Sequence, residues 1–278
     1  MFNTIISAAE LSAHLADADA NWRIIDCRHD LSDTEAGRRA YQAGHIPGAV
    51  FAHLDEDLSG PIIPGTTGRH PLPCVTAMEQ QFGKWGIGTD TQVVVYDDKR
   101  GAIASRLWWM LRYLGHSAVA VLDGGLAAWL AQGGNLSTAI SKPTPTDFQT
   151  DVQTDWVRDA AAVEESQSDT TQTIVDSRGA ARYRGEVEPI DPVAGHIPGA
   201  ISMPFAENWQ EDGLLKSSEV LRERFADLPR AGQVTFYCGS GVTACHNLLA
   251  YAHAGLGNAN LYPGSWSEWI TDSGRGVA

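Results

Sequence analysis

An internal repeat is the feature that most constrains the fold of this chain. The segment AGHIPGA at residues 43–49 occurs a second time at residues 194–200. Two further pairs follow in the same order: IIDCR at 24–28 matches IVDSR at 174–178, and LDGG before Trp129 matches YPGS before Trp269. Self-similarity at matching positions along two halves predicts a tandem duplication, in which each half forms the same unit.

Each half alternates short β-rich runs with segments of helical pattern. The runs lie at residues 22–26, 93–96 and 118–122 in the first half and at 173–176, 234–237 and 260–262 in the second. Such alternation is typical of βα units around a parallel sheet that helices cover on both faces. We therefore expect an α/β fold with two tandem domains, at 1–138 and 153–278, joined by an extended linker at 139–152 that contains Pro, Ser and Thr.

Composition and charge limit the classes of partner. The 278 residues are 43% hydrophobic and 19% charged, which is ordinary for a globular chain with a sizeable core. The formal net charge of −14 disfavours nucleic acid and anionic membrane as partners, so an anionic substrate has to be bound by local groups. The first 20 residues lack the pattern of a secretion signal, and no apolar run approaches about 18 residues. We expect a cytoplasmic protein.

The four cysteines are Cys27, Cys74, Cys238 and Cys245. They form neither a CxxC pair nor a Cys/His zinc spacing, so the sequence indicates no disulfide framework and no metal site. A reducing compartment fits this pattern best. Cys245 falls on an apolar helical stripe with Leu248 and Leu249, and we expect it to be a packing residue.

Cys238 stands in a different context, the segment CGSGVTA at 238–244 between an apolar strand-like run and a helical pattern. A chain that leaves a strand, passes two glycines and enters a helix directs several N–H groups and the positive helix end toward the cysteine. Such surroundings stabilise a thiolate or a bound anion. The sequence therefore predicts a reactive cysteine at residue 238.

The repeat supplies an internal control for this prediction. Asp97 follows the run VVVY at 93–96 in the same way that Cys238 follows VTFY at 234–237. The loop DDKRG at 97–101 has no sulfur, and its two carboxylates would repel an anion. We expect only the second copy to be chemically active.

These residues together resemble the two-domain, rhodanese-like sulfurtransferases, and the resemblance covers nearly the whole chain. It is carried by the Asp-x-Arg strand ends, both HIPGA turns, Asp97 in place of a cysteine, and the loop CGSGVTA. The loop is similar to that of the members that use 3-mercaptopyruvate, because thiosulfate-using members typically place basic residues where Gly239 and Ser240 stand. The resemblance implies 3-mercaptopyruvate as the sulfur donor, with thiosulfate as the alternative.

The resemblance also implies a mechanism. Cys238 would take the outer sulfur of the donor, become a persulfide, and pass the sulfur to a thiol, to cyanide or to a thioredoxin-like protein. No metal or organic cofactor is implied. Gly239, Gly241, Val242 and Thr243 would line the substrate site with backbone and side-chain donors.

Loss of sulfur from 3-mercaptopyruvate leaves an enolate that needs a proton, so a general acid or relay is expected beside the cysteine. Ser240 lies two residues along the loop. The segment RHPLP at 69–73 matches the family's His-x-Leu-Pro motif, and Leu54-Asp55 matches its aspartate. The resemblance thus implies that His70 and Asp55, from the first domain, act with Cys238 and Ser240. His45 and His196 occur in both copies and are expected to be structural, as are the Asp-x-Arg pairs.

Arg182 matches a substrate arginine of the family, and an arginine offers a bidentate donor to a carboxylate. The chain departs from the family pattern nearby, where animal mercaptopyruvate enzymes have a second arginine and this chain reads Glu188-Pro189-Ile190-Asp191. Ile190 cannot bind a carboxylate. Arg69, next to His70, is our candidate for the missing anchor.

Two other functions compete with this interpretation. A cysteine-dependent phosphatase needs an arginine six residues after its cysteine, and that position is Ala244. A non-catalytic module would use Cys238 only to store sulfur or to sense oxidants, with little turnover. In that case Cys27 and Cys74 are further candidates for a redox role.

Overall fold

The computed structural model describes residues 1–15 and 21–278. Its internal contacts divide them into two compact units. The first unit comprises Met1–Gly60 and Pro73–Gln153, and the second comprises Pro61–Leu72 and Thr154–Ala278. The second unit therefore includes a short segment, 61–72, that lies in the sequence between two parts of the first unit.

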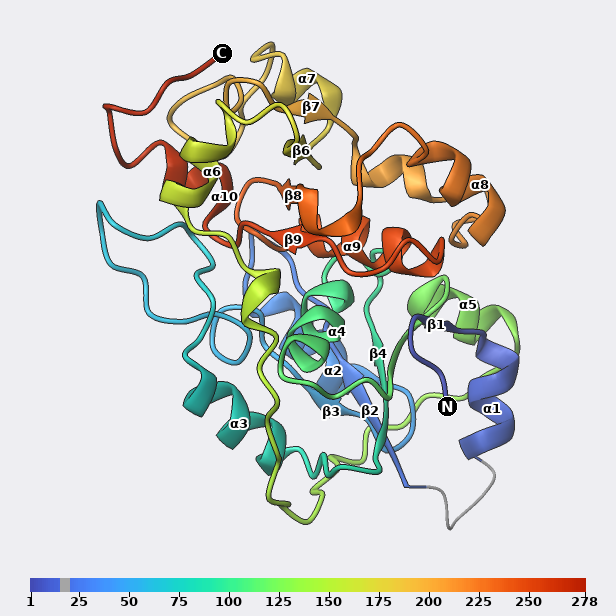
Figure 1. The fold of residues 1–278 in the computed structure, drawn as a ribbon. Coiled ribbons are helices and arrows are strands. Elements are labelled where there is room, and N and C mark those ends of the chain that lie inside the picture. The colour runs from blue at the N-terminus through green and yellow to red at the C-terminus, as the bar shows by residue number, and fades with distance from the viewer. Residues whose placement is uncertain (16–20) are drawn as a thin grey trace. The chain divides into compact units, whose positions relative to one another are not determined.

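The first unit contains a parallel, five-stranded sheet in the order β1-β5-β4-β2-β3 (Figure 1). Its strands are β1 (Ile5–Ile6), β2 (Trp22–Asp26), β3 (Val50–Phe51), β4 (Gln92–Tyr96) and β5 (Val119–Leu122). β4 lies between β2 and β5, and all five of its residues are buried. A continuous apolar strand such as VVVY is typical of a parallel sheet that is covered on both faces.

Helices cover both faces of this sheet. They are α1 (Ala8–Leu15), α2 (Ala36–Ala43), α3 (Val75–Lys84), α4 (Ala104–Tyr113) and α5 (Gly125–Ala131). On one face, Leu11 of α1, Tyr41 of α2 and Trp129 of α5 pack in one buried cluster with side chains of the strands. Alternate strand residues point to the opposite face, where α4 packs against β4 and β5.

The second unit has a parallel, four-stranded sheet in the order β7-β6-β8-β9. Its strands are β6 (Thr173–Asp176), β7 (Ile201–Ser202), β8 (Val234–Tyr237) and β9 (Asn260–Leu261). Its helices are α6 (Ala160–Ser166), α7 (Ala180–Tyr183), α8 (Ser218–Arg224), α9 (Ala244–His253) and α10 (Ser265–Trp269), with 3-10 turns at Thr154–Trp156, Phe205–Asn208 and Ala231–Gln233. α6 and α10 pack on one face of the sheet. Phe225, at the end of α8, and Tyr251 of α9 contact Phe236 on the other face. The α/β fold expected from the repeat is confirmed in both units.

Both units have the same structural frame, an Asp–Arg ion pair, at the end of the strand that carries the Asp-x-Arg sequence. The Asp26 carboxylate accepts from the Arg28 guanidinium at 2.6 Å, and Arg28 also donates to the Gly44 carbonyl at 2.8 Å. In the second unit, Arg178 pairs with Asp176 at 2.6 Å and donates to the Gly195 carbonyl at 2.7 Å. Because the arrangement recurs in the copy that has Asp97 in place of the loop cysteine, we assign it to folding.

The HIPGA histidines show the same duplication. His45 stacks on Tyr41 with ring centroids 3.9 Å apart, and His196 stacks on Tyr183 at 3.8 Å. In each case Nδ1 lies within hydrogen-bond distance of the carbonyl of that tyrosine. These contacts fix the turn onto the preceding helix and give both histidines a structural role.

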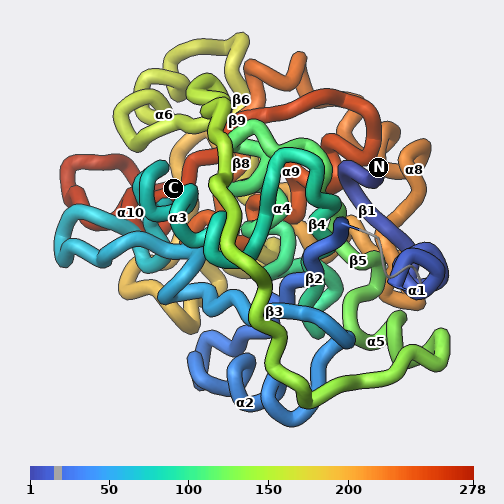
Figure 2. The backbone as a smooth tube through the Cα atoms, turned by 90° about the horizontal axis from the view of Figure 1, so that it is seen from below, coloured from blue at the N-terminus to red at the C-terminus, as the bar shows by residue number. Residues whose placement is uncertain are grey.

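The chain between α5 and α6 runs as a long extended trace, green to yellow in Figure 2. It packs on the first unit, since Thr146 N donates to the Gly83 carbonyl at 2.9 Å and Phe148 is buried against Phe82. Among the described residues, no helix is both long enough and apolar enough to cross a membrane.

Candidate active site

The loop after β8 holds Cys238 at the carboxyl end of an inner strand. β8 ends at Tyr237 and α9 begins at Ala244, so five residues join Cys238 to the helix (Figure 1). Gly241 adopts a φ of 76°, and a Cβ there would lie 2.2 Å from the Pro263 carbonyl oxygen. Only glycine fits this close approach. Trp266 N donates to the Cys238 carbonyl at 3.0 Å and fixes the start of the loop.

The Cys238 side chain is surrounded by hydrogen-bond donors. The residue is 2% exposed. Four groups donate to its sulfur: the Thr243 hydroxyl and the backbone N–H groups of Ser240, Gly241 and Ala244. Burial opposes ionisation of the thiol, but these donors outweigh it and hold the pKa of Cys238 below its ordinary value. These donors therefore favour the thiolate form of Cys238.

Ser240 and His70 lie together at this loop. Ser240 Oγ is hydrogen-bonded to His70 Nδ1 at 2.7 Å, and both residues are buried. The proton of this bond sits on either atom according to the histidine tautomer. We expected His70 to come from the first domain, but Pro61–Leu72 belongs to the second unit by its contacts.

The first turn of α10 together with its N-cap, residues 264–267, holds the His70 segment in place. Arg69 N donates to Ser267 Oγ at 3.0 Å. A Cβ on Gly68 would lie 2.5 Å from the Gly264 carbonyl oxygen, so the two backbones pass too closely for any other residue. Ser265, in the same turn, accepts from Cys238 N at 3.1 Å. One turn therefore positions both the cysteine and the histidine.

Two arginines reach the same loop. A Cβ built on Gly239 would lie 3.0 Å from Arg69 Nη2 and 3.5 Å from both terminal nitrogens of Arg182. The guanidinium groups of Arg69 and Arg182, both expected from the sequence to bind substrate, therefore lie side by side at this point of the loop. Gly239 leaves them room that a larger residue would fill.

The sequence interpretation missed two carboxylates that hold these arginines. Asp191 accepts from Arg69 Nη1 through one oxygen and from Arg182 Nη2 at 3.1 Å through the other. Glu188 pairs with Arg182 at 2.7 Å. We had noted Glu188 and Asp191 only as the place where a family arginine is absent. The sequence did contain a signal for them: Glu188 and Asp191 lie a few residues after Arg182, for which no ion-pair partner was expected.

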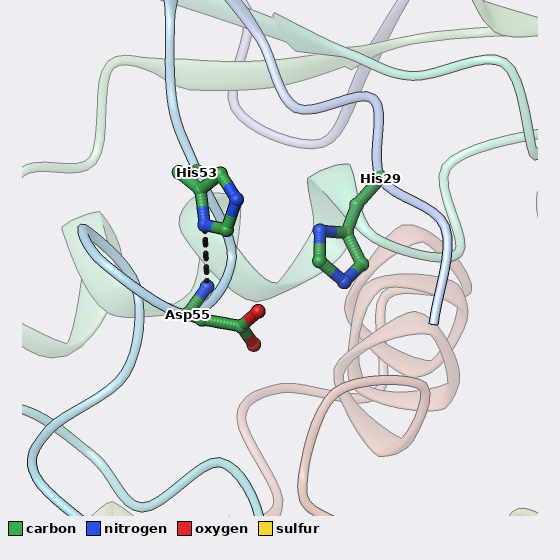
Figure 3. A group of neighbouring side chains, drawn as sticks. All are labelled: His29, His53 and Asp55. Atoms are coloured by element: carbon green, nitrogen blue, oxygen red, sulfur yellow. Dashed lines mark hydrogen bonds between the residues drawn. The ribbon is translucent and has the colours of Figure 1, made fainter. Parts of the chain in front are cut away.

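Asp55 lies in the first unit, close to two histidines (Figure 3). Its backbone N–H donates to His53 Nδ1 at 3.1 Å, and its carboxylate points toward His29. One ligand atom from each of His29, His53 and Asp55 lies within 4.8 Å of the others. However, His53 Nδ1 also accepts from Glu56 N, and His53 Nε2 lies 3.0 Å from the Thr34 carbonyl. Both nitrogens of this ring are engaged with backbone, so the cluster is a poor metal site.

The other cysteines differ from Cys238 in their surroundings. Burial and nearby carboxylates raise the pKa of Cys27 well above its ordinary value, so it stays an inert thiol. Cys245 is buried, and its Sγ lies 3.4 Å from the Gly241 carbonyl, which helps to fix the loop. Cys74 is exposed before α3.

In the first unit, the space inside the matching loop is occupied by the side chain of Asp97. Asp97 is completely buried, and its carboxylate accepts four backbone N–H bonds at 2.8 Å. The donors are Lys99, Gly101, Ile103 and Ala104. This loop therefore holds a fixed carboxyl group where the second holds the Cys238 sulfur.

Comparison with known proteins identifies the family of this chain. A family model described as the rhodanese-like domain matches residues 7–132 and 159–272. A Pseudomonas aeruginosa protein named probable 3-mercaptopyruvate sulfurtransferase is 47% identical over 278 residues, covering 99% of this chain and 97% of that protein. The thiosulfate sulfurtransferase of Cricetulus griseus is 37% identical over 257 residues, covering 89% of this chain and 84% of that protein.

The solved structures give the same result for the fold. SseA from Escherichia coli, described as a 3-mercaptopyruvate sulfotransferase with the rhodanese fold, superposes with a TM-score of 0.81 at 33% identity. The match covers 96% of this chain and all of that one. With two matched domains and relatives aligned along nearly its whole length, the chain belongs to the rhodanese-like domain family, among its two-domain sulfurtransferases.

Proposed function

We propose that the second unit transfers sulfur from 3-mercaptopyruvate to a thiol acceptor through a persulfide on Cys238. The observation that carries the proposal is the buried Cys238 sulfur, which accepts from four loop donors and has a lowered pKa. A persulfide is an anion of the same kind, so the donors that stabilise the thiolate stabilise the loaded form too.

The first half-reaction balances within the residues of this loop and the donor. The Cys238 thiolate attacks the donor sulfur, a sulfur–sulfur bond forms, and the carbon–sulfur bond breaks. Its electron pair passes to the carbon as an enolate. The proton of the donor thiol ends on that carbon, which gives pyruvate, and Cys238 is left as the persulfide anion. An acceptor thiolate then attacks the outer sulfur and restores the Cys238 thiolate.

The Ser240–His70 pair supports 3-mercaptopyruvate over thiosulfate as the donor. An enolate needs a proton as it forms, and a hydroxyl hydrogen-bonded to a histidine at 2.7 Å beside the nucleophile can relay one. Sulfite, the product from thiosulfate, leaves as a stable anion and needs no proton. A buried proton relay of this kind is needed only when the leaving group is an enolate, which must be protonated on carbon.

Arg69 and Arg182 are the groups proposed to bind the donor's carboxylate. Both guanidinium groups lie at Gly239, next to the nucleophile, and a carboxylate is the usual partner of such donors. In this proposal Arg69 replaces the family arginine that is absent at Ile190. If Arg69→Ala leaves the KM for 3-mercaptopyruvate unchanged, this assignment is wrong.

The remaining assignments rest on the family resemblance. Asp55 is proposed as an acidic residue of the proton relay, for which Asp55→Asn should lower kcat with 3-mercaptopyruvate and spare thiosulfate. Loop residues Val242 and Thr243 complete the substrate site. The acceptor is proposed to be a small thiol, cyanide or a thioredoxin-like protein, in a reducing, cytoplasmic setting that suits four cysteines of which none forms a disulfide.

The test is steady-state sulfur transfer to a small thiol, with 3-mercaptopyruvate and thiosulfate assayed side by side and intact mass measured on the loaded protein. We expect higher kcat/KM with 3-mercaptopyruvate, and one added sulfur that Cys238→Ser lacks. A preference for thiosulfate would overturn the donor, and loading of Cys238→Ser would overturn the carrier. Stoichiometric loading without turnover would favour the storage module. Hydrolysis of p-nitrophenyl phosphate that Cys238→Ser abolishes would favour the phosphatase.

A further inference from the structure

We propose that Asp191 is a positioning residue that makes the donor site selective for a singly charged carboxylate over doubly charged thiosulfate. This inference rests on the proposed function, because it concerns the same site. Each oxygen of the Asp191 carboxylate accepts from one of the two arginines that lie at Gly239.

The first step of the argument is the continuity of the ion pairs. The Asp191 bridge joins Arg69 to Arg182, Arg182 pairs with Glu188 at 2.7 Å, and Glu188 lies 3.3 Å from Arg178. The last member is Asp176, which pairs with Arg178 in the structural frame at the end of β6. The two arginines at the loop are thereby tied to the sheet through alternating charges.

The second step is the direction in which the guanidinium groups point. Arg69 uses Nη1 for Asp191, whereas its Nη2 lies 3.0 Å from the position of a Cβ on Gly239. Arg182 uses Nη2 for Asp191, and both its Nη1 and its Nη2 lie 3.5 Å from that position. One carboxylate therefore holds two like-charged groups close together at the loop and engages one terminal nitrogen of each, which leaves Arg69 Nη2 and Arg182 Nη1 for a ligand. Two such nitrogens match the two oxygens of a carboxylate.

The third step is the balance of charge. The network contains three guanidinium groups, on Arg69, Arg178 and Arg182, and three carboxylates, on Asp176, Glu188 and Asp191. Its formal charge is zero. The site therefore binds an anion through directed N–H donors rather than through excess positive charge. This neutral network offers no extra positive charge to balance the second negative charge of thiosulfate, which would lie next to the thiolate of Cys238.

Removal of the Asp191 charge should thus affect the two donors in opposite directions. In Asp191→Asn the arginines lose their common anchor, so the paired nitrogens no longer fit a carboxylate as well. The site also gains one unit of positive charge, and attraction to a dianion grows twice as much as attraction to a monoanion. A site that is merely damaged would lose both donors alike.

The experiment measures kcat and KM for both donors in the unaltered protein, Asp191→Asn, Asp191→Glu and Glu186→Gln. Glu186→Gln is the matched control, because it removes the same charge from an exposed pair with Arg184 nearby. For Asp191→Asn we expect KM for 3-mercaptopyruvate to rise about tenfold and KM for thiosulfate to fall, with kcat changed less. Asp191→Glu keeps the negative charge but places the carboxylate one methylene further from the backbone, so only the KM for 3-mercaptopyruvate should rise. The control should keep the ratio of the two KM values.

A second readout needs no turnover. Pyruvate and sulfate, a monoanion and a dianion, are tested for protection of Cys238 against alkylation. Asp191→Asn should weaken protection by pyruvate and strengthen protection by sulfate; if Asp191→Asn does not fold, Asp191→Glu must still weaken protection by pyruvate alone. Equal changes for both anions, or none, overturn the inference. If the unaltered protein uses only thiosulfate, the proposed donor fails, whereas a fall in KM for thiosulfate in Asp191→Asn still upholds the role of Asp191.

Discussion

The loops at Asp97 and Cys238 follow equivalent strands and meet the same electrostatic condition in different ways. In both, backbone N–H groups converge on the first residue after the strand. In the first unit the carboxylate of Asp97 takes all four bonds and is completely buried. In the second, three N–H groups and the Thr243 hydroxyl surround a sulfur that can change its bonding.

We call this set of converging N–H groups the anion cradle. The comparison indicates that the fold supplies the anion cradle, whereas the side chains around it supply the chemistry. The first loop fills its cradle with the buried Asp97 carboxyl group, whose oxygens accept all four N–H bonds and stabilise the turn. The second leaves the cradle to a thiolate and adds Ser240, His70 and two arginines. The positions that match Gly239 and Ser240 in the first loop are Asp98 and Lys99, which supply neither the space nor the relay.

The largest effect is expected when the nucleophile is moved between the loops. The double variant Cys238→Ser with Asp97→Cys should lose all sulfur transfer, because the new thiol would lie in a cradle without the relay or the arginines. Intact mass after incubation with either donor is the measurement, with Cys238→Ser alone as the control. One added sulfur in the double variant only would show that the cradle by itself suffices.

The next effect concerns the relay. Ser240→Ala keeps the backbone N–H that donates to the sulfur but removes the partner of His70. We expect kcat with 3-mercaptopyruvate to fall about a hundredfold or more, since this is the usual contribution of a positioned acid or base. Transfer from thiosulfate should change little, because sulfite leaves without a proton. An equal loss with both donors would mean that Ser240 only shapes the loop.

A change in the first loop should affect stability rather than sulfur transfer. Asp97→Ala would leave four buried N–H groups without their acceptor, and we expect it to lower the free energy of unfolding by about 3 kcal/mol. Urea unfolding measures this, with the exposed neighbour in Asp98→Ala as the control, expected to change stability by less than about 0.5 kcal/mol. Equal stability of the two variants would contradict a structural role for the filled cradle.

The smallest effect is expected from one donor of the second cradle. Thr243→Val removes a hydroxyl that lowers the pKa of Cys238, so the pKa should rise and less thiolate should be present at neutral pH. Alkylation of Cys238, which requires the thiolate, should then slow about tenfold at pH 7, and its midpoint should move to higher pH. Thr243→Ser keeps the hydroxyl and should retain the original profile. Identical pH profiles for valine and serine would exclude this hydrogen bond as a cause.

The sequence predicted the inner strands well, but of the four outermost short strands it predicted only β9, within the run at 260–262. The runs at 22–26, 93–96 and 234–237 are long and apolar enough to be recognised, and they correspond to β2, β4 and β8. β1, β3 and β7 have two residues each. Such pieces carry no periodic pattern, and they are strands only because a neighbouring strand supplies the hydrogen-bond partners.

By itself, the sequence determined the duplication and the α/β class and predicted a reactive Cys238, because all three follow from patterns within short segments. Only the tertiary structure decided what surrounds that cysteine. His70 bonds to Ser240 across 170 residues, and Arg69 pairs with Asp191 across 122. No local pattern encodes such pairs. They arise because the segment at 61–72 packs against the turn at 264–267 and brings a histidine and an arginine to a loop formed far along the chain.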